Sequence, residues 1–68
     1  MRRLRVTATI DKDTASPDSI QAAQTFLTAA LLERAEDNEV ALNWNTWHSY
    51  SRRTMSGDLV IIQWARVI

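Results

Sequence analysis

The fold of this chain is decided near its N-terminus by the stretch Arg3-Leu4-Arg5-Val6-Thr7-Ala8-Thr9-Ile10. Every second side chain from Leu4 to Ile10 is apolar, and the side chains between them are arginine or threonine. A period of two over this length is typical of a β-strand with one buried face. Polar residues from Asp11 to Ala15 then interrupt the pattern, so a turn is expected after the strand.

A helix is expected to follow, beginning at Ser16-Pro17-Asp18 and ending at about Asp37. Serine before a helix accepts hydrogen bonds from the free N–H groups of the first turn, and proline suits the first helical position. Asn38 is expected to end the helix in a left-handed conformation. At the helical period, one side carries Ile20, Ala23, Phe26, Leu27, Ala30 and Leu31, whereas Leu32 falls on the polar side.

Two further strands are predicted, one beginning at Val40 and one over residues 59–68. The segment from Tyr50 to Asp58 is expected to connect them. The sequence therefore predicts a single α+β domain over residues 1–68, with β-α-β-β order and two layers. One helix packs on a three-stranded, mostly antiparallel sheet. The register is open, since Trp64 lies opposite Trp44 in one pairing and beside Asn43 or Asn45 in another.

The last predicted strand is apolar on both faces, whereas one helix covers only one face of the sheet. Soluble monomers rarely leave such a patch exposed. We therefore expect a homo-oligomer, with a dimer favoured, joined through the open sheet face or through the edge of the last strand. The alternative is a local distortion that brings both faces of this strand under the helix.

The composition excludes several classes of protein. The chain has 68 residues, eight basic and eight acidic, with no cysteine and one glycine. Disulfide scaffolds, thiolate metal sites and glycine-rich phosphate loops are therefore excluded. No apolar run approaches the ~18 residues of a membrane span, and no signal peptide is recognisable, so a cytoplasmic protein is expected.

Signatures of enzymes and metal sites are weak. His48 is the single histidine, and it points away from Ser49 if both lie on a strand, which defeats a catalytic triad with Asp58. Asp11 and Asp13 begin like a calcium loop but lack its glycine and its distant glutamate. We expect no catalytic residue, no metal site and no cofactor.

The charges are expected to gather at the two ends of the domain. Arginines of the first and last strands would lie beside Glu33, Glu36, Asp37 and Glu39 at the end of the helix, and Arg52 and Arg53 would lie in the hairpin loop at the other end. Arginine suits bidentate pairing with carboxylates, so salt bridges are one interpretation. The other is an acidic docking patch formed by Glu33, Glu36, Asp37 and Glu39.

Tryptophan and arginine are the most suggestive residues for function, because both are preferred anchors of protein interfaces. We therefore predict a non-enzymatic, regulatory module that self-associates and binds another protein. Its candidate partner-binding residues are Trp47, Trp64, Arg52 and Arg53, with Glu33, Glu36 and Asp37 as a second patch. The alternative is a sheet face that stacks single-stranded nucleic acid or a flat aromatic cofactor.

The element order, the length and the helix start Ser16-Pro17-Asp18-Ser19 are similar to those of dodecins, small flavin-binding proteins that assemble into hollow dodecamers. In dodecins the tryptophan that stacks on the flavin opens the second strand. The corresponding place here lies near Glu39 and Val40, and Trp44 comes later. The resemblance therefore implies a shared topology and no function.

Overall fold

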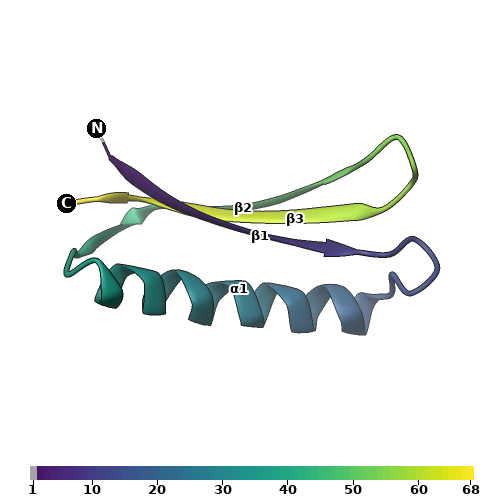
Figure 1. The fold of residues 1–68 in the computed structure, drawn as a ribbon, viewed down its shortest axis with the longest axis horizontal. Helices are drawn as coiled ribbons and strands as arrows, with labels where there is room; N and C mark the ends of the chain where they lie inside the picture. Colours follow the sequence, from purple (N-terminus) through teal and green to yellow (C-terminus); the bar gives the residue numbers. More distant parts are fainter. Residues whose placement is uncertain (1) are drawn as a thin grey trace.

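A computed structural model describes residues 2–68 as one helix against one sheet. The elements follow in the order β1 (Arg3–Ile10), α1 (Pro17–Asp37), β2 (Leu42–Arg53) and β3 (Leu59–Val67). The two layers lie face to face along the length of the domain (Figure 1). The predicted α+β fold with β-α-β-β order is confirmed.

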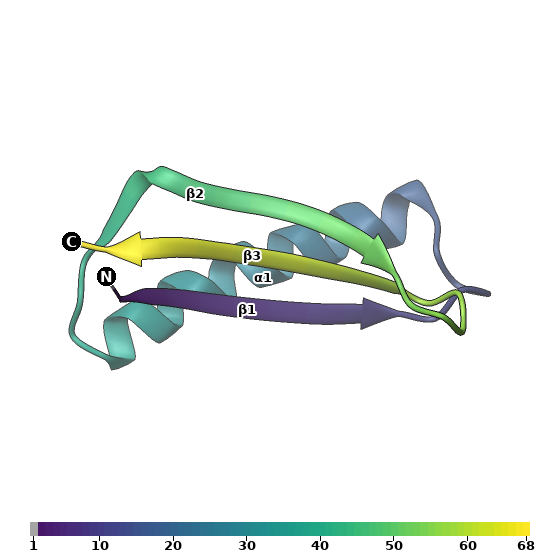
Figure 2. The same ribbon diagram turned by 90° about the horizontal axis from the view of Figure 1, so that it is seen from above.

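The sheet has the strand order β1-β3-β2, and β3 pairs antiparallel with both neighbours. The last strand is therefore the central one, so its expected role as a free edge is wrong. The helix covers one face of this central strand, and on the other face its Ile62 is buried among side chains of the two flanking strands. The free edges belong to β1 and β2 (Figure 2).

The helix begins where the sequence predicts, at a capping box. The Ser16 side chain accepts a hydrogen bond from the backbone N–H of Ser19 at 3.1 Å, and the Ser19 side chain accepts from the backbone N–H of Ser16 at 2.8 Å. At the other end Asn38 has a φ of −89°, so it is not the left-handed residue. Glu39 takes that conformation instead, with a φ of 55°.

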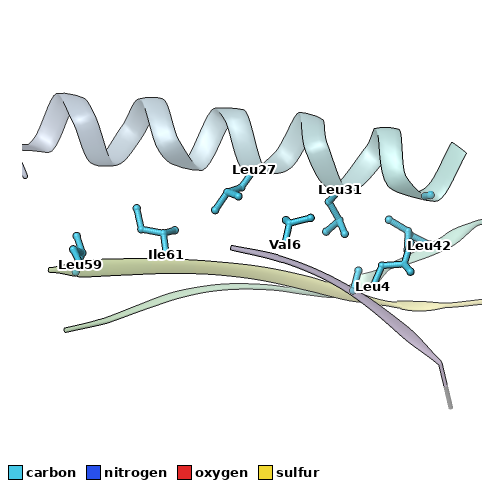
Figure 3. Packing of buried hydrophobic residues seen from close by; sticks show 9 residues of the cluster. Leu4, Val6, Leu27, Leu31, Leu42, Leu59 and Ile61 are labelled. Atoms are coloured by element: carbon cyan, nitrogen blue, oxygen red, sulfur yellow. The ribbon is translucent and has the colours of Figure 1, made fainter. Parts of the chain in front are cut away.

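The core lies between α1 and the facing side of β1 and β3 (Figure 3). Leu27, Leu31 and Ala35 are the buried helical residues, one turn apart. Phe26 does not join them, because its side chain is 67% exposed, and the prediction that it faces the core is wrong. The exposed position expected for Leu32 is confirmed.

One buried polar side chain ties the helix to the sheet. Gln63 lies on the helix-facing side of β3 and is 2% exposed. Its amide Nε2 donates to the carbonyl oxygen of Gln24 at 2.9 Å, and its Oε1 accepts from the hydroxyl of Thr28 at 3.0 Å. Both ends of the amide are thus satisfied, as burial of a polar group requires.

A bulge in β2 sets the register of the hairpin. Asn43 pairs with Arg66 and His48 pairs with Trp64, so the four residues 44–47 of β2 stand against the single residue Ala65 of β3. The Thr46 hydroxyl bridges the gap, since it accepts from the backbone N–H of Arg66 at 2.9 Å and donates to the carbonyl oxygen of Asn43 at 2.7 Å. Both expected registers of Trp64 are therefore wrong.

The hairpin connection is shorter than predicted. Strand β2 continues to Arg53, and the chain turns between Thr54 and Asp58. Gly57 has a φ of +92°, which glycine adopts without strain. The Asp58 carboxylate accepts a hydrogen bond from the backbone N–H of Lys12 at 3.1 Å, which joins this turn to the loop between β1 and α1.

Candidate binding surface

The side of the sheet that faces away from α1 is defined here as the open sheet face, and Figure 2 looks onto it with the helix behind the strands. Its members follow from the strand pairing and the bulge. They are Arg3, Arg5, Thr7 and Thr9 of β1, Val60, Ile62, Trp64 and Arg66 of β3, and Asn43, His48, Tyr50 and Arg52 of β2.

All formal charge on this face is positive. Four of its residues are arginines, and none of the strand residues placed on this face by the described pairing is Asp or Glu. Arg3 and Arg66 lie directly opposite each other on neighbouring strands. Like charges at directly opposed positions destabilise a sheet, so an anion that binds between them removes a repulsion.

Trp64 lies at the centre of this positive region. Its ring lies 4.5 Å from the ring of His48, between centroids, with the planes 30° apart. The Arg3 guanidinium carbon Cζ lies 5.0 Å from the centroid of the same indole. A cation at this distance is attracted to the ring. The half-buried Trp64 is therefore held by a neighbour from each adjoining strand.

The apolar part of the open sheet face is less exposed than the sequence suggests. Ile62 is fully buried although no helix covers it, and Val60 is half-buried. Thr7 and Tyr50 lie directly opposite Ile62 on the two flanking strands. The prediction of a broad apolar patch on this face is wrong, because side chains of the two flanking strands shield the central strand. Tyr50 is the large side chain that stays exposed.

The other two tryptophans lie elsewhere. Trp47 packs against the core on the helix-facing side of the sheet, and Trp44 stacks on it with ring centroids 4.6 Å apart and planes 10° apart. Trp44 is 56% exposed, whereas Trp47 is half-buried. The structure thus separates the predicted site residues Trp47 and Trp64 onto opposite faces of the sheet.

Arg52 and Arg53 are neighbours on strand β2 and not in the hairpin loop, where the sequence places them. Arg52 pairs with Val60 and belongs to the open sheet face. Arg53 pairs with Leu59 on the opposite face, and its guanidinium donates to the carbonyl oxygen of Gly57 at 3.0 Å. Only one of the two predicted arginines therefore belongs to the basic surface.

The predicted acidic patch lies on the other layer. Glu33, Glu36 and Asp37 are exposed at the C-terminal end of α1, away from the open sheet face. Nearby arginines donate to neutral oxygens: Arg2 to the Asn38 side chain at 3.1 Å, and Arg34 to the carbonyl oxygen of Arg5 at 3.3 Å. The net charge is zero, but the charged residues are separated: arginines lie on the open sheet face, and acidic residues lie at the end of the helix.

Sequence reasoning did not identify Arg3 and His48 as the partners of Trp64. The signal for Arg3 is its alternation with Leu4, which places it on the polar face of β1. His48 carries no such signal, since the bulge decides which β2 residue lies opposite Trp64. His48 and Ser49 pair with successive β3 residues, so they lie on opposite faces as expected.

Within residues 2–68, which the structure describes, no helix has the length and apolar character needed to cross a membrane. No three acidic or histidine side chains come together as ligands for a metal ion within the same residues.

Comparisons with protein-family models, with curated proteins and with solved structures find no match to this chain.

Proposed function

We propose that this chain is a small, non-enzymatic binding module that self-associates and binds an acidic segment of another protein on its open sheet face. The observation that supports this function best is the charge of that face, which has four arginines and no carboxylate on its described strands. Complementary charge favours encounter with an anionic partner and disfavours a cationic one.

The residues around Trp64 supply the centre of this surface. Arginine and aromatic residues are enriched among the side chains that dominate interface energies. Arg5 lies opposite Trp64 on β1, and Arg66 lies two residues further along β3 on the same face. Tyr50 adds an exposed aromatic ring. A carboxylate placed between Arg3 and Arg66 offsets the repulsion of these two opposed arginines, which gives the site a preference for Asp or Glu.

Single-stranded nucleic acid or a flat aromatic ligand is the second candidate. It is favoured by the presence of indole rings beside arginines, because bases stack on aromatic side chains. Two observations make it the weaker candidate. Trp64 already contacts His48 and Arg3, and the more exposed Trp44 lies off the basic face.

The test is fluorescence anisotropy of a labelled poly-glutamate peptide, titrated with the protein at low salt. We expect saturable binding that weakens with added salt, since exposed charges are screened. Arg66→Glu should weaken binding several-fold. The neighbours Arg52 and Arg53 provide a matched pair: Arg52→Glu should weaken binding, whereas Arg53→Glu, on the opposite face, should not.

A labelled oligo(dT) strand distinguishes the two candidates. Tighter binding of oligo(dT) than of poly-glutamate, lost in Trp64→Ala, would replace the proposal with the nucleic-acid function. Absence of saturable poly-glutamate binding would overturn it.

A further inference from the structure

No strand among the described residues pairs with the outer backbone edge of β1, and along this edge the Arg5 carbonyl oxygen accepts a hydrogen bond from the Arg34 guanidinium at 3.3 Å. The N–H of Val67 donates to the carbonyl oxygen of Arg2 at 2.9 Å, which fixes the direction of the backbone groups. By alternation, the backbone N–H and C=O groups of the even-numbered β1 residues point toward β3. Those of Arg3, Arg5, Thr7 and Thr9 point toward the free edge, while the side chains of these four residues lie on the open sheet face. The strand holds no proline that would block pairing with another strand.

A groove runs beside this edge between β1 and α1. It is lined by Arg5, Val6 and Thr7 of the strand and by Phe26, Ala30 and Arg34 of the helix, together with Leu27. Phe26 and Thr7 border the same groove, so both lie beside this stretch of the edge. Phe26 stays 67% exposed there, which is unusual for a phenylalanine on a helix that has a buried face.

We infer that a second copy of this chain occupies the β1 edge, so that two β1 strands pair antiparallel about Thr7 and the two Phe26 side chains meet across the two-fold axis. This inference deepens the proposed self-association and rests on it. It places the interface at β1, instead of at the open sheet face or the edge of β3.

The helix supports this arrangement because one of its stripes is self-complementary. Successive residues at four-residue spacing are Asp18, Ala22, Phe26, Ala30 and Arg34. An antiparallel copy centred on Phe26 brings Ala22 opposite Ala30 and Asp18 opposite Arg34. Small residues then flank the aromatic pair, and opposite charges lie at the same level along the helix axes at both ends.

Strand β1 and the residue that follows it also have charges that match those of a second, antiparallel copy. Pairing about Thr7 places Arg3 of one copy opposite Asp11 of the other, and Arg5 opposite Thr9. Pairing about Val6 also joins outward-facing backbone groups, but it brings the two Arg5 side chains to diagonal positions. Like charges in such proximity are unfavourable. The charges on β1 therefore favour Thr7 over Val6 as the centre.

The distance between the two helices in this dimer also fits helix packing. Helix α1 packs on β1 and β3, so it lies over the gap between these strands. In the dimer the two helices lie two strand spacings apart, about 9–10 Å at ~4.8 Å per spacing. This separation matches the interaxial distance of about 8–10 Å between packed helices. The two open sheet faces then form one continuous surface that carries the arginines of both copies.

Sedimentation velocity of the full chain tests the interface. The native protein should sediment as a dimer of the 7.8 kDa chain. Phe26→Glu should sediment as a monomer while remaining folded, since this side chain is exposed in the single chain. Leu32→Glu is the matched control, because Leu32 is also exposed but lies on another side of the helix, and it should remain dimeric.

Proline substitutions test the strand. Thr7→Pro removes an N–H that faces the free edge and should give a monomer. Ser51→Pro removes an outward N–H at the other free edge, on β2, and should leave the dimer intact. Circular dichroism of each variant confirms that the fold is retained.

Charge reversal tests the antiparallel register. Asp18→Arg and Arg34→Asp should each weaken the dimer, because each alone places like charges opposite each other. An equimolar mixture of the two variants should restore it as a heterodimer. A monomeric native protein would contradict both the interface and the proposed self-association. A dimer that persists in Phe26→Glu and Thr7→Pro would overturn this interface alone.

Discussion

At the scale of single residues, two polar side chains hold parts of the backbone that the hydrophobic pattern does not position. Gln63 joins β3 to the helix from within the core, and Thr46 supplies the acceptor that the bulged strand β2 lacks. Each is tied to a backbone group of another element. Each therefore has a stability effect that can be measured without reference to binding.

Gln63→Ala should lower the free energy of unfolding by about 2–3 kcal/mol, because it removes two hydrogen bonds and leaves a cavity. Thr28→Val, which removes one of the two partners, should cost about 1 kcal/mol. Urea unfolding followed by circular dichroism measures both. Gln21→Ala, on the exposed side of the same helix, should change stability by less than about 0.5 kcal/mol. An equal loss in Gln63→Ala and Gln21→Ala would contradict the role of the buried amide.

Thr46→Val should cost about 1–2 kcal/mol, since valine keeps the shape of threonine but leaves the Arg66 N–H and the Asn43 carbonyl without this partner. Thr46→Ser keeps the hydroxyl and should retain most of the stability. Thermal unfolding of the three proteins tests the prediction. Thr46→Ser as unstable as Thr46→Val would show that the hydroxyl is not what stabilises the bulge.

At the scale of elements, the helix and the first strand are well predicted because their signals are local. Period-two alternation marks β1, and Ser16-Pro17 marks the start of α1. The end of β2 and the position of Trp64 were not predictable in the same way. The end of β2 depends on its pairing with β3, and the residue opposite Trp64 depends on a bulge in which Thr46 accepts a hydrogen bond from Arg66, twenty residues along the chain.

Helical periodicity also placed Phe26 wrongly, for a physical reason. The hydrophobic stripe gives the apolar side of a helix, but the sheet beneath α1 covers only part of that side. A single helix over the edge of a narrow sheet leaves one margin of its stripe uncovered, and Phe26 lies on that margin beside Thr7.

The capping box predicts a measurable contribution at the start of α1. Ser16→Ala should lower the free energy of unfolding by about 1 kcal/mol, because the first turn loses its side-chain acceptor. Ser16→Asp keeps an acceptor and adds a negative charge near the positive end of the helix dipole, so it should be close to neutral. Chemical unfolding measures both variants. An equal loss of unfolding free energy in Ser16→Ala and Ser16→Asp would contradict the role of the cap.

At the scale of the whole molecule, strand order and charge distribution were the least accessible to sequence reasoning. An apolar strand on both faces is equally consistent with a central strand and with an uncovered one, and pairing partners are not encoded locally. Placing β3 at the centre buries Ile62 and brings the arginines of β1, β2 and β3 onto one face. A formal net charge of zero therefore conceals a molecule with two different sides.

The proposed function depends on this division of charge more than on any single residue. A neutral chain has no long-range attraction for anions as a whole, but a basic face directs an acidic partner to one side. The interface inferred at β1 doubles the width of that face. Binding is thus assigned to the open sheet face and self-association to the β1 edge, with Arg3 common to both, and each is tested by its own variants.

The most direct test of the binding surface is nuclear magnetic resonance of the isotope-labelled protein during titration with a poly-glutamate peptide at low salt. The account predicts that the backbone amide signals of the strands around Trp64 move, with Arg3 and Arg66 among the largest changes, and that the signals of α1 stay in place. Changes confined to α1, or no saturable change in any signal, would contradict it.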